Sequence, residues 1–515
     1  MSDAKQAIVL QPGKRWERSL SIYRRMTTMA DHFDHSILDD EPLSTKGRKY
    51  RQSVISTMEM QDLKGSLHNE SINSRRSTFV SKPSRSTIRI VRDSDTSRAS
   101  LCSNSIFEES QGFLTEDCDD TIVELSKLSI ADSEHEVTVL EKIHDTSNRF
   151  ATARDYVLRR CNQTDVILFD ECYPDTVLKN CRKIGEGVYG EVFLWRAGDG
   201  RARVLKIVPI AGNIKVNGEN QKNYHEIISE IVIAMELSGL RAPIADIEKH
   251  FNEGKSVETL DLHSVENATD VFNEVLAVRC VYGSYPSRLL DLWDLYDECK
   301  GSENDNPAIL PVDQQYIVLE LANAGQDLES YQFNNAEQAY ALFKQVAFGL
   351  AVAEEAYQFE HRDLHWGNVL ISPTDQKYAT FVLRGRAHRV ARRGVSAAVI
   401  DYSLSRAALR LPAGERATLY NDLAADDGLF DAVGDYQFEV YRLMREKLGN
   451  DWKNFEPYTN ILWLHYTVDK MITALRYTRT NTKIHKHYIA KLKEIKNRIL
   501  DYGSAVQYVL TDNEL

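Results

Sequence analysis

Apolar residues are spread unevenly along this 515-residue chain, and their spacing separates a polar first part from a body with regular elements. From Ser53 to Ser105 the chain is rich in Ser, Thr, Asn and Arg and shows little apolar periodicity, which is typical of a disordered segment. Farther on, short apolar runs predict strands, and apolar residues at three-to-four spacing predict a helix over 224–240. We therefore expect a mostly disordered regulatory region over 1–149 and a folded domain over 150–515.

The most informative run is H-R-D-L-H-W-G-N at residues 361–368. An Asp followed five residues later by an Asn is typical of the catalytic loop of protein kinases. In that loop the Asp accepts the proton of a substrate hydroxyl, and the Asn holds a metal ion between the ATP phosphates. Asp363 is therefore the candidate base, and Asn368 is a candidate metal ligand.

A glycine-rich run, G-E-G-V-Y-G-E-V, precedes it at residues 185–192. Glycines allow a tight turn whose backbone amides can approach phosphates without interference from a Cβ atom. An ordinary hairpin is one alternative, and a dinucleotide fingerprint is another, although that motif must open a helix. Because strand-like residues follow, we favour a phosphate-binding loop between strands, with nucleotide contacts at Gly185, Gly187, Gly190 and Val192.

A lysine lies within the next apolar run, which spans residues 202–208. A buried ammonium is costly unless it is paired, so Lys206 is either an edge-strand residue facing solvent or a functional residue. Its position after the glycine loop favours pairing with ATP phosphates and with a carboxylate on the next helix. Glu230 lies in the apolar middle of that helix and is the preferred partner, whereas Glu226 is the alternative.

The strand predicted over 315–321 leads into a polar stretch that fits the connection between two kinase lobes. Backbone groups there, at Ala322 and Asn323, would bind the adenine edge, and Leu321 would close the back of the pocket. Asp327 is expected to accept the ribose hydroxyls, or else to cap a helix that begins after it.

The metal-binding D-F-G of kinases is replaced by Asp401-Tyr402-Ser403, after an apolar strand at 398–400. Asp401 is the second candidate metal ligand. No A-P-E motif follows, so the usual activation segment is missing or rebuilt, and residues 409–433 take its place. Without glycine the motif has less freedom to flip, because glycine visits φ > 0 at little cost.

From about residue 150 onward the chain closely resembles the haspin protein kinases. The resemblance rests on H-R-D-L-H-W-G-N-V-L, on D-Y-S-L-S-R in place of D-F-G, and on long blocks at 434–444 and 457–466. It implies an α+β, bilobal protein-kinase-like fold, with a small, mostly β N-lobe carrying one helix and a mainly helical C-lobe. It further implies a serine/threonine kinase that uses ATP and Mg²⁺ and acts without activation-loop phosphorylation.

Haspins phosphorylate a threonine near the N-terminus of histone H3 in mitosis, and this mark recruits the chromosomal passenger complex to inner centromeres. The resemblance therefore implies the histone H3 tail as partner. It also implies a nuclear location on chromosomes and centromeres in mitosis, with the cytoplasm or spindle as further candidates. It supports the roles given to Lys206, Glu230, Asp363, Asn368 and Asp401.

Two departures from common kinase patterns matter for the site. His365 replaces the lysine that most protein kinases carry two residues after the base, and haspins share this histidine. Asp426 falls at an acidic position that contacts the histone tail, whereas the family's second acid is replaced by Gly428. We take Asp426 and its neighbour Asp427 as the candidate substrate-binding residues.

Charge and composition agree with this interpretation. Residues 1–100 contain 18 Lys and Arg against 12 Asp and Glu, whereas the whole chain has a net charge of −13, so the remainder carries −19. An acidic body suits a basic peptide and argues against direct nucleic-acid binding by the kinase domain. No apolar run approaches the ~18–20 residues that span a bilayer, so no membrane association is expected.

The basic tail contains Arg two residues before Ser77, Thr78 and Thr87. Basophilic kinases accept this pattern, so an upstream basophilic mitotic kinase is a candidate partner. The alternative is a solvated linker that is not phosphorylated. Residues 75–98 are also a candidate pseudosubstrate for an acidic cleft, and an acidic stretch over 108–141 separates them from the body.

Other classes of function were weighed against a kinase. A pseudokinase scaffold would be expected to lack Lys206, Asp363, Asn368 or Asp401, and all four are present. A histone-tail-binding scaffold remains an alternative that a tail-binding assay with and without ATP would distinguish. A small-molecule kinase of the aminoglycoside or choline type usually carries H-x-D in a different context.

Overall fold

The computed structural model describes residues 152–196, 200–256, 260–410, 416–424 and 426–512. The expectations for the N-terminal region, including the sites at Ser77, Thr78 and Thr87, lie outside these ranges. Among the described residues, no helix has both the length and the apolar character needed to cross a bilayer.

The first part of the domain is built on a six-stranded sheet in the order β1-β5-β6-β4-β3-β2. Neighbouring strands are antiparallel except for the short β1–β5 pair. The predicted strand at 315–321 is confirmed as the central strand β6, and the glycine-rich run joins β2 to β3 as expected. The strands are β1 (Ile167–Leu168), β2 (Cys181–Gly187), β3 (Gly190–Arg196), β4 (Ala202–Ile210), β5 (Val275–Tyr282) and β6 (Gln315–Ala322).

The helix predicted over 224–240 is confirmed as α8 (Tyr224–Gly239). It begins with a capping box, in which the backbone N–H of Asn223 donates to Glu226 at 2.7 Å. This contact gives Glu226 a local structural role, which leaves Glu230 as the carboxylate on the inner face of the helix. Glu230 is buried among the isoleucines of that face.

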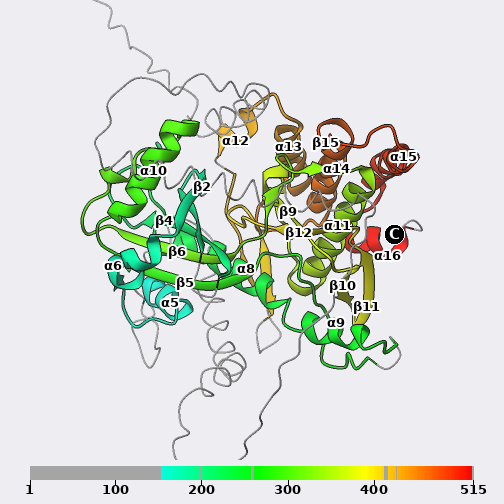
Figure 1. Cartoon of the computed structure of the whole chain (residues 1–515), viewed down its shortest axis with the longest axis horizontal. Helices are drawn as coiled ribbons and strands as arrows, with labels where there is room; N and C mark the ends of the chain where they lie inside the picture. Colours follow the sequence, from blue (N-terminus) through cyan, green and yellow to red (C-terminus); the bar gives the residue numbers. More distant parts are fainter. Residues whose placement is uncertain (1–151, 197–199, 257–259, 411–415, 425, 513–515) are drawn as a thin grey trace, which may run out of the picture. The chain divides into compact units, whose positions relative to one another are not determined.

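The expectation of one helix in the N-lobe was wrong, because insertions add several more. Helix α10 packs against the edge strand β2 and α6 against the edge strand β1, whereas α5 packs against α8 (Figure 1). The additional helices are α5 (Ala153–Arg160), α6 (Phe169–Cys172), α7 (Asp175–Leu178), α10 (Ser287–Lys300) and the 3₁₀ turn η3 (Pro307–Ile309). Helix α9 (Ile244–Asn252) also falls in this stretch of sequence but packs against the strand at 378–383 in the second part of the domain.

The second part of the domain is organised around the buried helix α11 (Ala336–Tyr357), which contacts α14, α15, α16 and β12. Near its end, the buried carboxylate of Glu354 accepts hydrogen bonds from Asn460 and from the backbone N–H groups of Ala505 and Val506. Burial raises the pKa of Glu354 to about 7. The other helices are α12 (Asp427–Asp431), α13 (Tyr436–Leu448), α14 (Tyr458–Thr473), α15 (Lys483–Arg498), η5 (Ile499–Asp501) and α16 (Ala505–Thr511).

Short strands position the residues between these helices. The sheet β12-β9-β7 places the end of the catalytic loop beside the strand that leads to Asp401. The hairpin β10–β11, whose turn and second strand contain most of the arginine-rich segment 384–393, lies beside α9 (Figure 1). These elements are β7 (Gln326–Asp327), β8 (Gln332–Phe333), η4 (Trp366–Asn368), β9 (Val369–Pro373), β10 (Tyr378–Leu383), β11 (Arg386–Ala391), β12 (Val395–Val399), β13 (Ala407–Arg410), β14 (Arg416–Leu419) and β15 (Arg476–Tyr477).

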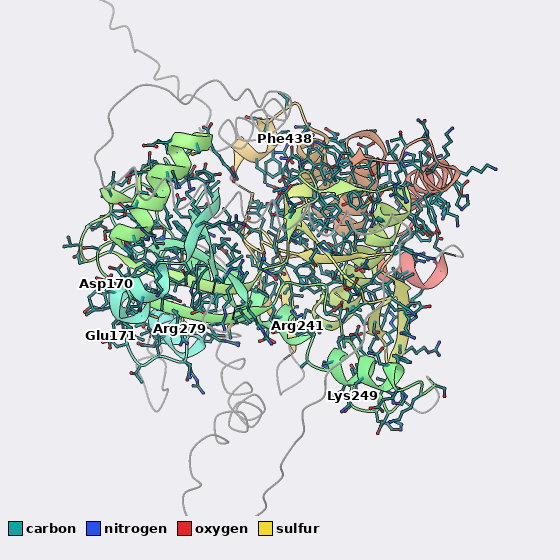
Figure 2. The ribbon with its side chains drawn as sticks, viewed as in Figure 1. Asp170, Glu171, Arg241, Lys249, Arg279 and Phe438 are labelled. Carbon is teal, nitrogen blue, oxygen red and sulfur yellow. The ribbon has the colours of Figure 1, made fainter. Side chains whose placement is uncertain are left out.

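Side chains separate by polarity as a packed domain requires. Figure 2 labels Phe438 of α13, which is buried, together with the charged residues Asp170, Glu171 and Lys249, which are exposed. The fully buried side chains of Glu360 and Arg362 are paired with each other.

Two glycines are required by close backbone approach. A Cβ atom on Gly190 would lie 2.0 Å from the carbonyl oxygen of Ile207 in β4, and one on Gly325 would lie 2.0 Å from that of Ile371 in β9. Gly325 also has a φ of +99°. By contrast, a Cβ atom on Gly185 would meet nothing within 4 Å. The glycines of the loop between β2 and β3 are therefore not equivalent, since Gly190 serves the sheet itself.

We predict that Gly190→Ala destabilises the protein by about 1–3 kcal/mol, because overpacking against a neighbouring backbone costs that much. Gly185→Ala is the matched control, and its melting temperature is expected to stay close to that of the wild type. Thermal unfolding of both variants measures the difference. Equal melting temperatures for the two variants would show that β3 and β4 do not pack this closely.

Candidate active site

Lys206 joins three elements of the domain. Its side chain rises from β4, where the residue lies opposite Val192 of β3 in register. The Nζ atom is 2.8 Å from Oε1 of Glu230 on α8 and 3.3 Å from Oδ2 of Asp401, which follows β12. The structure therefore brings Lys206, Glu230 and Asp401 together as the sequence analysis expected.

Pairing of opposite charges keeps Lys206, Glu230 and Asp401 ionised. Burial opposes the ionised form of each, yet the two carboxylates hold the pKa of Lys206 above its ordinary value. Lys206 in turn holds the pKa of Asp401 well below the usual range for a carboxyl group, and the pKa of Glu230 is also lowered. At neutral pH the cluster contains one ammonium and two carboxylates.

A second lysine completes the cluster, and the sequence analysis missed it. Nζ of Lys222, just before α8, lies 3.2 Å from Oε2 of Glu230 and 4.4 Å from the ring centroid of Tyr189 in the glycine-rich loop. Glu230 therefore holds a different lysine on each carboxylate oxygen. No spacing rule points to Lys222, because the contact depends on how the segment before α8 folds back.

The catalytic loop is fixed by hydrogen bonds around Asp363. Nδ2 of Asn368 donates to the carbonyl oxygen of Asp363 at 2.8 Å, and Nδ1 of the buried His361 accepts the N–H of Asp363 at 3.3 Å. The other ring nitrogen of His361 lies 3.0 Å from the carbonyl oxygen of Ile400, next to Asp401. Burial lowers the pKa of His361 to about 4, so this link between the two motifs stays neutral.

His365 has a local role in the same loop. Its Nδ1 accepts the N–H of Gly367 at 3.0 Å and caps the short η4 turn that carries Asn368. A Cβ atom on Gly367 would lie 2.8 Å from the His365 ring, so the glycine makes room for the histidine. The structure therefore places His365 as a support for the position of Asn368.

The residues at the proposed metal position fit Mg²⁺. With its Nδ2 bonded to Asp363, Asn368 is left with its side-chain oxygen as a ligand, and Asp401 supplies a carboxylate. Mg²⁺ prefers oxygen ligands and is usually held by one or two carboxylates together with substrate phosphates. The chemistry of this donor set therefore agrees with an ion that arrives with a nucleotide.

The D-Y-S motif is held in place by its tyrosine. Asp401 adopts a φ of +62°, so the strained position falls on the aspartate itself. The buried ring of Tyr402 lies among Phe272, Phe359 and His361, and its hydroxyl donates to the carbonyl oxygen of Val399 at 2.8 Å. This packing fixes the direction of Asp401 without a glycine in the motif.

The arginine of H-R-D is enclosed in the protein. Arg362 is fully buried, donates to both carboxylate oxygens of Glu360, and donates to the carbonyl oxygens of Trp452 and Asn454. Glu360 also accepts the hydroxyl of Thr459 at 2.8 Å. These contacts anchor the catalytic loop to the segment before α14.

The residues predicted for nucleotide binding lie along the end of β6 and beyond it. Leu321 is opposite Val204 of β4, and the N–H of Ala322 donates to the backbone carbonyl oxygen of Glu274. Asn323 is exposed. Oδ1 of Asp327 accepts the N–H of Ser330 at 2.7 Å. This bond closes a turn, so no helix begins there.

The segment after the β13–β14 hairpin carries the predicted substrate-binding residues. Asp426 is the N-cap of α12 and accepts the N–H of Leu429 at 3.2 Å. The side chain of Asp427 lies outside the described part, although its backbone begins α12. Substrate contacts of both residues stay predictions.

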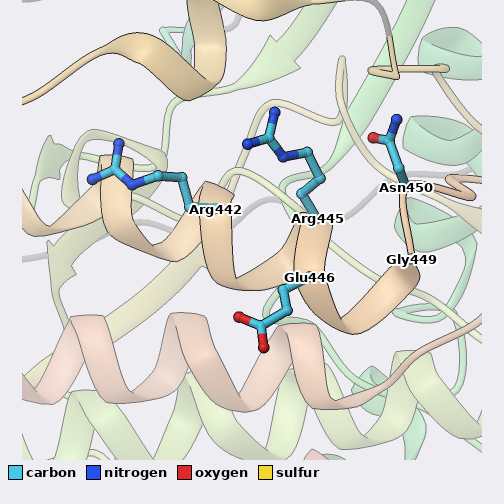
Figure 3. A pocket seen from close by; sticks show the side chains of 5 residues that line it. All are labelled: Arg442, Arg445, Glu446, Gly449 and Asn450. Atoms are coloured by element: carbon cyan, nitrogen blue, oxygen red, sulfur yellow. The ribbon is translucent and has the colours of Figure 1, made fainter.

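Two arginines of α13 hold this segment. Arg442 donates to the carbonyl oxygens of Phe430 and Ala432, and the guanidinium carbon of Arg445 lies 4.2 Å from the Phe430 ring centroid. Figure 3 shows both arginines beside a pocket of about 550 Å³ that is also lined by Glu446, Gly449 and Asn450. The arginines position α12, and hence Asp426, relative to α13.

Tyr441 touches the candidate base directly, and the sequence analysis gave it no role. Its hydroxyl donates to Oδ1 of Asp363, while its ring packs edge-on against Trp463 of α14. The residue lies in the block at 434–444 that carries the resemblance, but residue type alone does not show which way a helix face points. Tyr441 thus orients the Asp363 carboxylate from α13.

We predict that Tyr441→Phe lowers kcat by about tenfold or more, because a hydrogen bond to a charged group contributes roughly 1.5–3 kcal/mol. The KM for ATP should change little, since the hydroxyl of Tyr441 donates to the base, whose task is to accept the substrate proton. Tyr436→Phe is the matched control on the same helix, where the hydroxyl meets His465 instead of the base. A Tyr441→Phe variant with an unchanged kcat would contradict this role.

Comparison with known proteins identifies the family of this chain. A model of the haspin-like kinase domain matches residues 54–507. A serine/threonine-protein kinase haspin homolog of Drosophila melanogaster is 39% identical over 373 residues, which cover 71% of this chain and 61% of the relative. The haspin of Mus musculus is 35% identical over 416 residues, which cover 80% of this chain and 52% of the relative.

A third relative, a haspin homolog of Arabidopsis thaliana, is 32% identical over 505 residues, which cover 92% of this chain and 77% of the relative. The chain thus spans less than two thirds of the fly and mouse relatives. The family model nevertheless covers most of the chain, including every residue of the site described above. This chain belongs to the haspin-like kinase family.

Proposed function

We propose that this protein is a serine/threonine kinase that transfers the γ-phosphate of ATP to a threonine near the N-terminus of histone H3. The observation that carries the proposal is the convergence of Lys206, Glu230 and Asp401 beside the loop that bears Asp363 and Asn368. A pseudokinase needs no such arrangement. Membership in the haspin-like kinase family supports the same chemistry.

Each residue has a defined task in this proposal. Lys206, held by Glu230, offers its ammonium to the nucleotide phosphates, and Asp363, oriented by Tyr441, accepts the proton of the substrate hydroxyl. Asn368 and Asp401 would hold Mg²⁺, which neutralises charge on the phosphates when it is bound. Catalysis then depends on positioning and on electrostatic stabilisation.

The structure also supports activity without activation-loop phosphorylation. In the described residues, Arg362 is engaged by Glu360 and by two backbone carbonyl oxygens. Tyr402 packs against His361 and fixes Asp401. The catalytic loop and the metal-binding motif are thus held by internal contacts, and a phosphate group is not needed to order them.

The substrate and cellular setting are part of the proposal and rest on the family. The acidic body of the chain suits a basic histone tail, and the site would act on chromosomes and centromeres in the mitotic nucleus. An upstream basophilic mitotic kinase acting on the N-terminal region belongs to the same proposal.

The decisive experiment measures phosphate transfer from radiolabelled ATP to an H3 N-terminal peptide. Transfer is expected to the native peptide and not to the same peptide with its third-position threonine changed to alanine. Asp401→Asn and Asp363→Asn should each lower the rate on the order of a hundredfold or more, because each removes a carboxylate that takes part in the reaction. Near-normal transfer by Asp401→Asn would show that the phosphates bind elsewhere.

Asp426 offers a test of substrate binding that spares the fold. Asn caps a helix as well as Asp does, so Asp426→Asn removes charge and keeps the N-cap of α12. We predict a several-fold higher KM for the H3 peptide, a weaker salt dependence and an unchanged KM for ATP. Asp426→Ala, which also removes the cap, serves as comparison. A change confined to the KM for ATP would place Asp426 away from the peptide.

A further inference from the structure

The glycine-rich loop at 185–191 is covered by a connection between α10 and η3. We call residues 301–306 of this connection the strap. Three consecutive strap residues, Ser302, Glu303 and Asn304, donate hydrogen bonds to the loop. The strap and the loop lie more than one hundred residues apart in sequence, so the contact is made by the fold.

Asn304 makes the central contact of the strap. Its Nδ2 lies 3.0 Å from the carbonyl oxygen of Gly187, 3.4 Å from that of Gly190 and 2.8 Å from Oε1 of Glu191. Gly187 and Gly190 end β2 and begin β3, so one amide group holds both sides of the loop tip. Because carbonyl oxygens are engaged, the contact consumes none of the N–H groups that a phosphate would use.

A second segment, which precedes α8, bonds both to the loop tip and to the strap. Nδ2 of the buried Asn217 donates to the carbonyl oxygen of Val188 at 2.9 Å, at the loop tip. Asn217 and Asp305 also bond reciprocally, each accepting the other's backbone N–H at 2.7 Å. The loop tip, the strap and this segment therefore form one connected unit.

The base of the loop is anchored by charge. Glu186 accepts Nζ of Lys183 at 2.6 Å, the hydroxyl of Ser302 at 2.8 Å and the N–H of Glu303 at 2.9 Å. Lys183 is also 2.7 Å from Glu191 on the opposite strand. The ammonium of Lys222 lies over the ring of Tyr189 in the loop and also pairs with Glu230. The loop is therefore connected to the Lys206–Glu230 ion pair of the active site.

We propose that the strap preorganises the phosphate-binding loop. Asn304, supported by Asn217, would hold the loop in its nucleotide-binding conformation before a nucleotide binds. A loop ordered in advance loses less conformational entropy on binding, and this raises affinity for the ligand. The inference rests on the proposed function in one respect, namely that this loop binds ATP phosphates.

The test uses Asn304→Ala and, as a second variant of the same shape, Asn304→Asp, which replaces the donor by an acceptor facing carbonyl oxygens. Asn306→Ala is the matched control, because Asn306 lies two residues away in the strap but bonds Asp294 and Ala308 and makes none of the loop contacts above. Four quantities are measured on the full chain. They are hydrogen exchange of residues 185–191 without nucleotide, the Kd for ATP with Mg²⁺, the KM for ATP and the KM for the peptide.

Both Asn304 variants are expected to raise loop exchange and to weaken ATP binding by about five- to tenfold, the scale of one net hydrogen bond. The KM for the peptide should stay unchanged, which a general loss of structure would not produce. Asn306→Ala should match the wild type.

Unchanged loop exchange in both Asn304 variants would overturn the proposal. Faster loop exchange with no change in ATP affinity would also overturn it. If the wild type itself bound no ATP, the proposed function would be wrong. The exchange measurement would still show whether the strap orders residues 185–191.

Discussion

The structure of this site depends on one constraint, which is that the partly buried ammonium of Lys206 must be neutralised. A charge taken out of water is costly unless it is paired and hydrogen-bonded. Glu230 and Asp401 meet this need from two other elements, so satisfying one lysine fixes β4, α8 and the residue after β12 relative to each other. Glu230 carries a second lysine, Lys222, and the pairing thereby extends to the glycine-rich loop.

Internal contacts order the catalytic loop, the D-Y-S motif and the glycine-rich loop. In many regulated enzymes a phosphate group or a partner protein orders such segments instead. Arg362 is enclosed with Glu360, and Tyr402 fixes the D-Y-S motif against His361. Tyr441 orients Asp363 from α13, and Asn304 holds the glycine-rich loop from the strap. Each contact restricts the conformational freedom of a loop or side chain in advance, so less conformational entropy is lost when the substrate binds. The kinase site is therefore assembled by its own side chains.

Much of this site could be predicted from sequence, because its motifs have fixed spacing and its elements have clear periodicity. The helix α8 and the strand β6 were predicted nearly to their ends. The Lys206–Glu230 contact was predicted from the position of Lys206 after the glycine-rich loop and of Glu230 in the apolar middle of α8. Contacts between distant insertions could not be predicted, since nothing local marks Asn304 or Lys222 as a partner of the loop. The extra N-lobe helices and the sheet requirement at Gly190 were missed for the same reason: each is set by tertiary packing.

The most direct test of the central claim is an experimental structure of the phosphatase-treated protein without nucleotide. We expect Nζ of Lys206 within ion-pair distance of Glu230 and Asp401, with Lys222 on the second oxygen of Glu230. We also expect Arg362 buried against Glu360 in the same crystal. An α8 displaced from the sheet, with Glu230 turned to solvent or paired with Lys222 alone, would contradict the claim that the site assembles by itself.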